Sequence, residues 1–178
     1  MQFIMNYKKI ALLICGLAIV SCKTAKKTTS NDKEDNKEKK ELVRKDEKVY
    51  YTEQIKNDFR SVTPNAQQKF LEAYNATEKQ YAILFFTQGF SGEDIVVKND
   101  SETIFKGVVL TNKKNGLAKN MRINTTEETS IYDKSTKKTI YIKGDKARKH
   151  KFIYVMKGNA DEDKPYKITF SDKLRPEK

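Results

Sequence analysis

The chain has 178 residues and a formal net charge of +12, from 36 Lys and Arg residues against 24 Asp and Glu residues. It holds one histidine, two cysteines and no tryptophan. So few cysteines exclude a disulfide-rich scaffold. The absence of tryptophan, with other aromatic residues mostly in strand-like segments, argues against a stacking platform for bases. We therefore expect no nucleic-acid partner.

The first segment has the layout of an export signal. Lys8 and Lys9 form a basic start, and an apolar run follows over residues 10–20. This run is about half of the roughly 20 residues that a membrane-spanning helix requires. We therefore expect a cleaved signal over residues 1–21 rather than a permanent anchor helix. Met5 opens a shorter signal that would serve equally well, so the true start is left open between Met1 and Met5.

The signal ends in Ile19-Val20-Ser21-Cys22. This motif resembles the lipobox of bacterial lipoproteins, in which a branched apolar residue, a tolerant position and a small residue precede the cysteine. The resemblance covers residues 1–22 and implies a lipoprotein of the Bacteroidota type, with a diacylglycerol on the thiol of Cys22 and a cut just before it. Two or three acyl chains hold a protein on a membrane, where a single chain is marginal.

Lipidation would leave the mature chain without a free thiol. Cys15 lies in the discarded signal and Cys22 carries the lipid, so we expect no disulfide, no cysteine nucleophile and no thiolate zinc site. The folded part must then be stabilised by its own core, which a segment as long as residues 49–178 allows. We expect no cofactor.

Residues 22–48 are rich in lysine, aspartate and glutamate and contain almost no apolar side chain. Such a segment buries too little surface to offset its ordering entropy, so we expect a charged tether. Residues 23–27 lack the acidic cluster of surface-exported Bacteroidota lipoproteins, and Lys23 differs from the aspartate that retains some lipoproteins at the inner membrane. The resemblance thus implies the periplasmic face of an outer membrane, with a surface-facing orientation left open.

The folded part opens with a segment of ambiguous pattern, residues 49–62. Thr63-Pro64 then predicts a helix start, because a hydroxyl cap precedes a proline in the first turn. Four apolar side chains share one face of the following run: Ala66, Phe70, Ala73 and Tyr74. We expect a short amphipathic helix that ends near Asn75 and lies on an apolar surface.

From residue 80 the apolar period changes to two, and β-branched and aromatic residues become frequent. Eight strands are predicted, over residues 80–87, 93–99, 102–111, 117–124, 128–134, 138–143, 151–157 and 166–171. Turn-rich segments separate them without a helix signal. We therefore expect a mostly β fold, an antiparallel sandwich or barrel of about eight strands preceded by a short helix.

Two of these strands differ from the rest. Residues 81–86 and 152–156 are apolar on both faces, which is typical of strands covered on both sides, so we expect them to be neighbours at the middle of the core. In residues 167–170, by contrast, apolar and polar positions alternate, so Ile168 and Phe170 should face one way and Lys167 and Thr169 the other.

The search for catalytic or metal-binding groups is mostly negative. His150 lies among cations, where we expect a surface loop without the partners of a triad or a metal site. The carboxylate groups Glu93-Asp94, Glu127-Glu128 and residues 161–163 lack calcium-loop spacing. Residues 89–93 match neither a phosphate-binding glycine loop nor a nucleophile elbow. We expect no catalytic and no metal residues.

One cluster of cations offers a candidate binding site, in what we expect to be a hairpin loop. It consists of Lys143, Lys146, Arg148, Lys149 and Lys151. If the preceding turn, with its own lysines at 134, 137 and 138, lies at the same end of the sandwich, the two form one surface that attracts anions. The alternative is an ordinary solvated hairpin.

The sequence therefore predicts a lipid-anchored, non-enzymatic binding module of the cell envelope. Its partners would be the membrane, through the anchor, and a protein, a glycan or an anionic envelope component. A lipid-anchored enzyme of unknown chemistry and a structural or assembly accessory are the alternatives. The oligomeric state and the identity of the ligand are left open.

Overall fold

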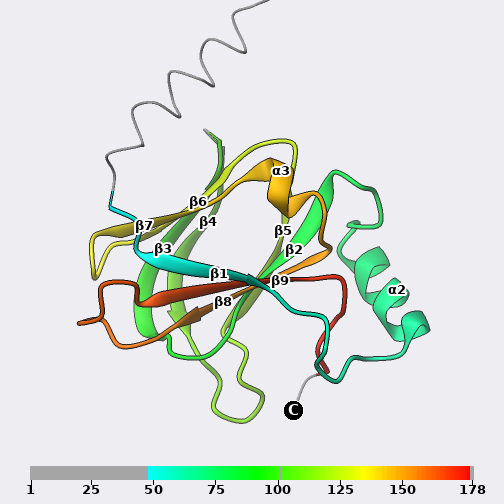
Figure 1. Cartoon of the computed structure of the whole chain (residues 1–178), viewed down its shortest axis with the longest axis horizontal. Helices are drawn as coiled ribbons and strands as arrows, with labels where there is room; N and C mark the ends of the chain where they lie inside the picture. The colour runs from blue at the N-terminus through cyan, green and yellow to red at the C-terminus, as the bar shows by residue number, and fades with distance from the viewer. Residues whose placement is uncertain (1–47, 101, 177–178) are drawn as a thin grey trace, which may run out of the picture. The chain divides into compact units, whose positions relative to one another are not determined.

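The computed structural model describes residues 48–100 and 102–176. The expected signal over residues 1–21, the lipid site at Cys22 and the tether up to residue 47 lie outside the described residues and stay predictions. The described chain is mostly β, with two sheets packed as a sandwich rather than a closed barrel (Figure 1). None of the helices in these described ranges has the length and apolarity needed to cross a bilayer.

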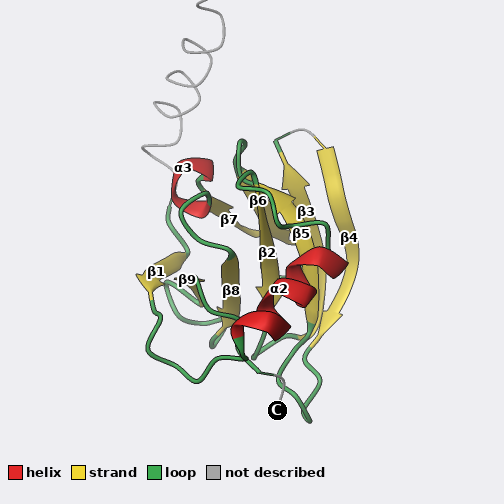
Figure 2. Cartoon of the chain, turned by 90° about the vertical axis from the view of Figure 1, so that its right-hand side faces the viewer, coloured by secondary structure: helices red, strands yellow, loops and turns green. Residues whose placement is uncertain are grey.

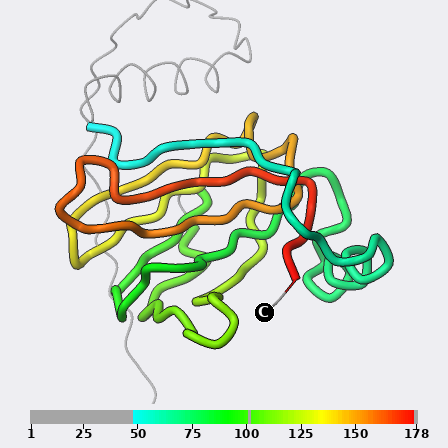
Figure 3. Tube along the Cα trace, turned by 60° about the horizontal axis from the view of Figure 1, so that its bottom comes forward, coloured from blue at the N-terminus to red at the C-terminus, as the bar shows by residue number. Residues whose placement is uncertain are grey.

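Sheet A contains five strands in the order β1-β9-β8-β2-β5. β1 in cyan, β9 in red and β8 in orange run side by side in Figure 3. The strands are β1 (Tyr51–Ile55), β2 (Tyr81–Phe86), β5 (Lys119–Asn124), β8 (Phe152–Lys157) and β9 (Tyr166–Ser171). β1 pairs with β9 and β2 with β8 in parallel, whereas β8 with β9 and β2 with β5 are antiparallel. Sheet A is therefore mixed, and the prediction of antiparallel sheets is wrong for it.

Sheet B contains four strands in the order β4-β3-β6-β7, and all of its pairs are antiparallel. The strands are β3 (Ser91–Asn99), β4 (Glu102–Leu110), β6 (Thr129–Asp133) and β7 (Lys138–Ile142). Short turns join β3 to β4 and β6 to β7, which is the pairing that neighbouring strand signals predict. All eight predicted strands are present among the described residues, and β1 is an additional strand from the ambiguous segment.

The main core lies between the two sheets. Ile168 and Phe170 of β9 are fully buried there, as the alternation in that strand predicts. They pack with inward residues of β2, β3, β7 and β8, which include Leu84, Ile95 and Ile142. Each large apolar side chain removed from water stabilises the fold by about 1.5–3 kcal/mol, so this layer is a principal source of stability.

A second core covers the outer face of sheet A. The helix α2 (Pro64–Ala73) packs there (Figure 2). Its Leu71 is buried, and the ring centroids of Phe70 and Phe85 lie 5.9 Å apart. The helix begins as predicted, because the hydroxyl of Thr63 accepts a hydrogen bond from the N–H of Ala66 at 3.3 Å. It ends before Asn75, which has a positive φ of 50°.

The two strands that are apolar on both faces are indeed neighbours. β2 and β8 pair at the centre of sheet A, between the two cores. The register begins with Ile83 opposite Phe152 and ends with Phe86 opposite Val155. Their parallel pairing has no local signal, because the whole of sheet B lies between them in the chain. A parallel pair requires such a long connection, whereas an antiparallel pair requires only a turn.

The segment between β7 and β8 crosses from sheet B to sheet A and contains the one-turn helix α3 (Gly144–Ala147). The prediction of a hairpin loop here is therefore wrong. Ala147 is buried in the main core, so it holds the crossover onto the sandwich. A Cβ at Gly144 would lie 2.6 Å from the carbonyl oxygen of Thr125, so this close approach requires glycine.

Candidate ligand-binding groove

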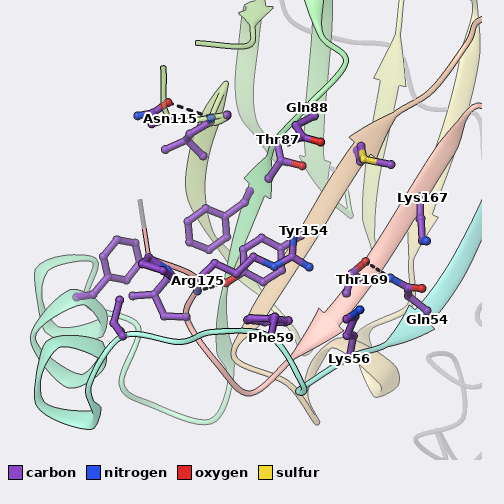
Figure 4. Close-up of a pocket in the computed structure, with 18 of the residues that line it drawn as sticks. Gln54, Lys56, Phe59, Thr87, Gln88, Asn115, Tyr154, Lys167, Thr169 and Arg175 are labelled. Carbon is purple, nitrogen blue, oxygen red and sulfur yellow. Dashed lines mark hydrogen bonds between the residues drawn. The ribbon is translucent and has the colours of Figure 1, made fainter. Parts of the chain in front are cut away.

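The outer face of sheet A carries a groove of about 650 Å³ beside the covering helix (Figure 4). Side chains of β1, β2, β8 and β9 form its floor, and α2, the segment before it and the C-terminal residues form its wall. Apolar side chains dominate the lining, including Phe59, Phe70, Phe85, Leu117, Tyr154 and Met156. A volume of this size lies in the range of about 300–1,000 Å³ that is usual for small-molecule sites.

The strand periodicity explains which residues reach the groove. Tyr154 and Met156 alternate with the inward residues Ile153 and Val155 of β8, and both reach the outer face. In β9 the outward positions are Lys167 and Thr169, again as the alternation predicts. The floor is therefore apolar along β8 and polar along β9.

The charge of the groove has one sign. Three cations line it, Lys56, Lys167 and Arg175, and its described lining contains no aspartate or glutamate. Lys56 is 3.7 Å from a carboxylate oxygen of Asp58, but both side chains are largely exposed, so this pair contributes little. The groove therefore attracts anions.

Arg175 is the cation most closely built into the wall. Its guanidinium lies 4.2 Å from the ring of Tyr154 and 4.5 Å from the ring of Phe59, as centroid distances. Its Nε is buried and has no hydrogen-bond partner among the described residues. Burial lowers the pKa of Arg175 and raises the pKa of Tyr154 to about 12, so at neutral pH Tyr154 is an uncharged phenol beside a cation.

A second cluster of ionisable groups lies inside the sandwich and joins the two sheets. The ammonium of Lys157 in β8 donates to Asp133 of β6 and Glu93 of β3, each at 2.8 Å. The hydroxyl of Tyr166 in β9 donates to the same oxygen of Asp133 at 2.6 Å. The other oxygen of Asp133 accepts two backbone N–H groups, from residues 135 and 136.

The bonds in this cluster decide the pKa values of its members. Burial by itself would raise the pKa of Asp133, but the bonds from Lys157 and Tyr166 outweigh it and hold that pKa below its ordinary value. Burial would likewise lower the pKa of Lys157, but its bonds to the two carboxylates raise it. Each charge is therefore held by a partner inside the fold, which is the arrangement of a structural bridge between sheets.

The cations predicted to bind an anionic partner have mostly internal contacts. Lys146 forms an ion pair with Glu53 of β1, and Arg148 donates to the carbonyl oxygen of Thr125 at 3.4 Å. Lys149 is exposed. Lys143 is exposed as well and has an interaction of its own within the structure.

Lys151 has the most complete set of internal contacts among these cations. Its ammonium donates to four carbonyl oxygens, those of Ala76, Thr77, Glu78 and Tyr81, at 2.5–3.2 Å. Burial lowers its pKa, and the charge of Glu78 opposes that change. Lys151 therefore ties the loop after α2 to the start of β8, and anion binding by these five cations stays a prediction.

The lysines of the β6–β7 turn do not join this cluster. That turn follows Asp133, which pairs with Lys138, whereas the crossover follows Ile142 at the other end of β7. The length of the strand separates the two by about 17 Å. The condition for one continuous basic surface is therefore not met.

The other groups singled out in the sequence have separate positions. His150 is not a solvated loop residue, because its side chain is 9 % exposed and its Nδ1 lies 3.0 Å from a carboxylate oxygen of Asp172. Glu93 and Asp94 point to different partners, Lys157 and Lys134 respectively. Among the described residues, no three His, Cys, Asp or Glu side chains are grouped to hold a metal ion.

The sequence did not predict the roles of three cations, Lys167, Arg175 and Lys157. The outward position of Lys167 was readable from the alternation in β9, but its neighbours across the sheet were not. Arg175 follows the last strand, where no periodicity indicates a position. Lys157 ends an apolar strand, and only the packing of sheet A on sheet B brings it to Asp133. No protein-family model matches this chain, and no curated protein matches it.

The buried bridge predicts a pH-dependent stability. Asp133→Asn should lower the free energy of unfolding at pH 7 by about 3 kcal/mol, because it weakens the neutralisation of the buried Lys157. The folded-state pKa of Asp133 is depressed, so its contribution is present above the unfolded value of about 3.9 and is lost as pH falls through the folded value. The difference between the two proteins should therefore shrink at pH 3, as measured by urea unfolding.

The control for this experiment is Asp94→Asn, which removes a partly exposed pair with Lys134 and should cost less than about 1 kcal/mol. Equal losses from both substitutions at pH 7 would contradict a special role of the buried bridge.

The contacts of Lys151 predict unequal effects within the basic crossover. Lys151→Glu should destabilise the fold by about 2 kcal/mol or more, because it removes the ammonium that four carbonyl oxygens share as a donor. Lys149→Glu should change stability by no more than about 0.5 kcal/mol, because that side chain is exposed. Thermal unfolding of both variants measures the difference, and two equally small shifts would show that the contacts of Lys151 contribute nothing.

Proposed function

We propose that this chain is a lipid-anchored, non-enzymatic binding module of a bacterial cell envelope, and that it holds an envelope component in the groove on the outer face of sheet A. The anchor would be Cys22, and the periplasmic face of an outer membrane would be its location. The observation that carries the proposal is the composition of the groove, which combines an apolar floor with cations and, within its described lining, no acidic group.

The groove supports binding more directly than catalysis. Its described lining holds neither a carboxylate nor a histidine, the groups most often used for general acid–base chemistry. The clustered carboxylates of the sandwich are instead bonded to Lys157, deep between the sheets. An apolar surface with charges of one sign fixes a ligand by burial and by orientation of its polar end. These are the properties of a carrier or receptor module.

The anchor is tested at the lipobox cysteine. Cys22→Ala should abolish incorporation of labelled palmitate and move the protein from the membrane fraction to the soluble fraction, because acyl chains supply the membrane affinity. Cys15→Ala is the matched control, since Cys15 lies in the expected signal and should leave labelling unchanged. Retention of both label and membrane association in the Cys22 variant would contradict the anchor.

The groove is tested with a neutral fluorescent probe, N-phenyl-1-naphthylamine, which brightens in apolar surroundings. The mature chain, residues 22–178, should bind it. Ala66→Trp should weaken this binding by about ten-fold or more, because Ala66 lines the groove and a larger side chain fills it. Ala73→Trp is the matched control, as Ala73 is exposed on the same helix but lies outside the lining.

Absence of probe binding by the unsubstituted chain would contradict the proposal and favour an assembly accessory. Equal weakening by both tryptophan substitutions would place the probe outside the groove and would contradict it as well.

A further inference from the structure

One cation in the wall of the groove has no acidic partner among the described residues. Arg175 lies between two aromatic rings, and no carboxylate pairs with it among the described residues. A guanidinium offers five N–H donors and stays charged. The Nε of Arg175 is buried and makes no hydrogen bond within the described chain, so the N–H groups of the two terminal nitrogens are the donors for a ligand in the groove. Ring contacts hold this cation in position without neutralising it, so donors remain for an anion. Guanidinium binds a carboxylate best, through two parallel hydrogen bonds.

Three polar side chains of the floor, Gln54, Thr87 and Thr169, are bonded within the protein. The amide of Gln54 donates to the hydroxyl of Thr169 at 2.9 Å, and the hydroxyl of Thr87 donates to the carbonyl oxygen of Val155 at 3.1 Å. A sugar or a peptide needs donors and acceptors along its length, and these bonds already occupy part of the capacity of Gln54, Thr87 and Thr169. A hydrocarbon chain needs none, and Met156 and Tyr154 offer it an apolar path.

The size of the groove restricts the ligand further. A volume of about 650 Å³ suits one ligand of drug-like size. A single acyl chain with a small head group falls in this class, whereas the two chains and large head group of a phospholipid exceed it. Lys167 on the floor adds a second positive charge without a described acidic neighbour in the lining, which favours a ligand with a negative end.

We infer that the groove binds a long-chain carboxylic acid, with its carboxylate on the guanidinium of Arg175 and its hydrocarbon chain along the floor at Tyr154 and Met156. This inference rests on the proposed function, because it names the ligand class of the same groove. It adds a direction to the binding: the head group lies at the C-terminal wall and the chain extends over β8. It also gives Arg175 a role as the residue that selects acids over neutral lipids.

The inference is tested by displacing N-phenyl-1-naphthylamine from the mature chain with laurate and with dodecanol, which share a hydrocarbon chain and differ in charge. Laurate should bind about ten-fold or more tightly than dodecanol, as expected for a charge-assisted hydrogen bond. Arg175→Gln should reduce this preference to about two-fold, with the affinity of the variant for the probe measured first so that both displacements are put on the same scale.

The matched control is Arg122→Gln. Arg122 also stacks on an aromatic ring, with 4.4 Å to the centroid of Tyr81, but it is not part of the groove lining. Its replacement should leave the laurate preference unchanged. Arg175→Lys keeps the charge and loses the bidentate geometry, so it should retain part of the preference. Thermal unfolding of each variant confirms that it is folded, and the Lys variant serves if the Gln variant is not.

Several results would overturn the inference. If the chain binds the probe and then binds laurate and dodecanol with equal affinity, the groove selects no acid. The inference would then be wrong, whereas the proposed function would remain. A laurate preference that survives Arg175→Gln would remove the role of Arg175. Displacement by anionic phosphatidylglycerol vesicles or by an apolar peptide with a free carboxyl terminus, at lower concentrations than laurate, would replace the ligand class. Absence of probe binding would overturn both proposals together.

Discussion

The central strands of sheet A are apolar on both faces, and the rest of the structure depends on covering them. Sheet B covers the inner face of β2 and β8, and α2 covers the outer face around Leu71 and Phe85. Burial of such side chains is the dominant favourable term in folding, so both covers are required. The outer cover is shorter than the sheet. The part of the outer face that it leaves open includes Met156 and Lys167, whereas Tyr154 lines the groove with only 4 % of its surface exposed.

The cations of this protein lie in two kinds of environment. Some are bonded to acceptors inside the fold, whereas Arg175 lies in the wall of the groove. Lys157 is buried, and two carboxylates neutralise it at 2.8 Å each, so its charge serves the contact between the sheets. Lys151 is satisfied by four carbonyl oxygens. The guanidinium of Arg175 contacts two aromatic rings, and the backbone N–H of this residue donates to the hydroxyl of Tyr154 at 3.0 Å. A charge without a partner beside an apolar surface is costly. In the proposed complex, the carboxylate of the ligand would supply that partner for Arg175.

Local patterns predicted the parts of this architecture that local chemistry determines. The cap at Thr63, the alternation in β9 and the two-sided apolar pattern of β2 and β8 each depend on neighbouring residues, and all three were correct. The parallel pairs of sheet A and the strand β1 were missed, because their partners are remote in the sequence and Tyr51–Ile55 has no strong alternation. The groove forms only where the parallel pairs of sheet A meet the end of the covering helix α2. No single segment of the sequence therefore indicated it.

The most direct test of the account is a two-dimensional ¹H–¹³C NMR titration of the methyl groups with laurate. If the hydrocarbon chain lies on the outer face of sheet A, the methyl resonances of Met156 and Leu117 should shift. These methyl groups should also show intermolecular nuclear Overhauser effects to the acyl chain. Val108 and Leu110 are exposed apolar residues of β4 in sheet B, and their resonances should stay unchanged. Shifts confined to Val108 and Leu110 would place binding on sheet B and contradict the account.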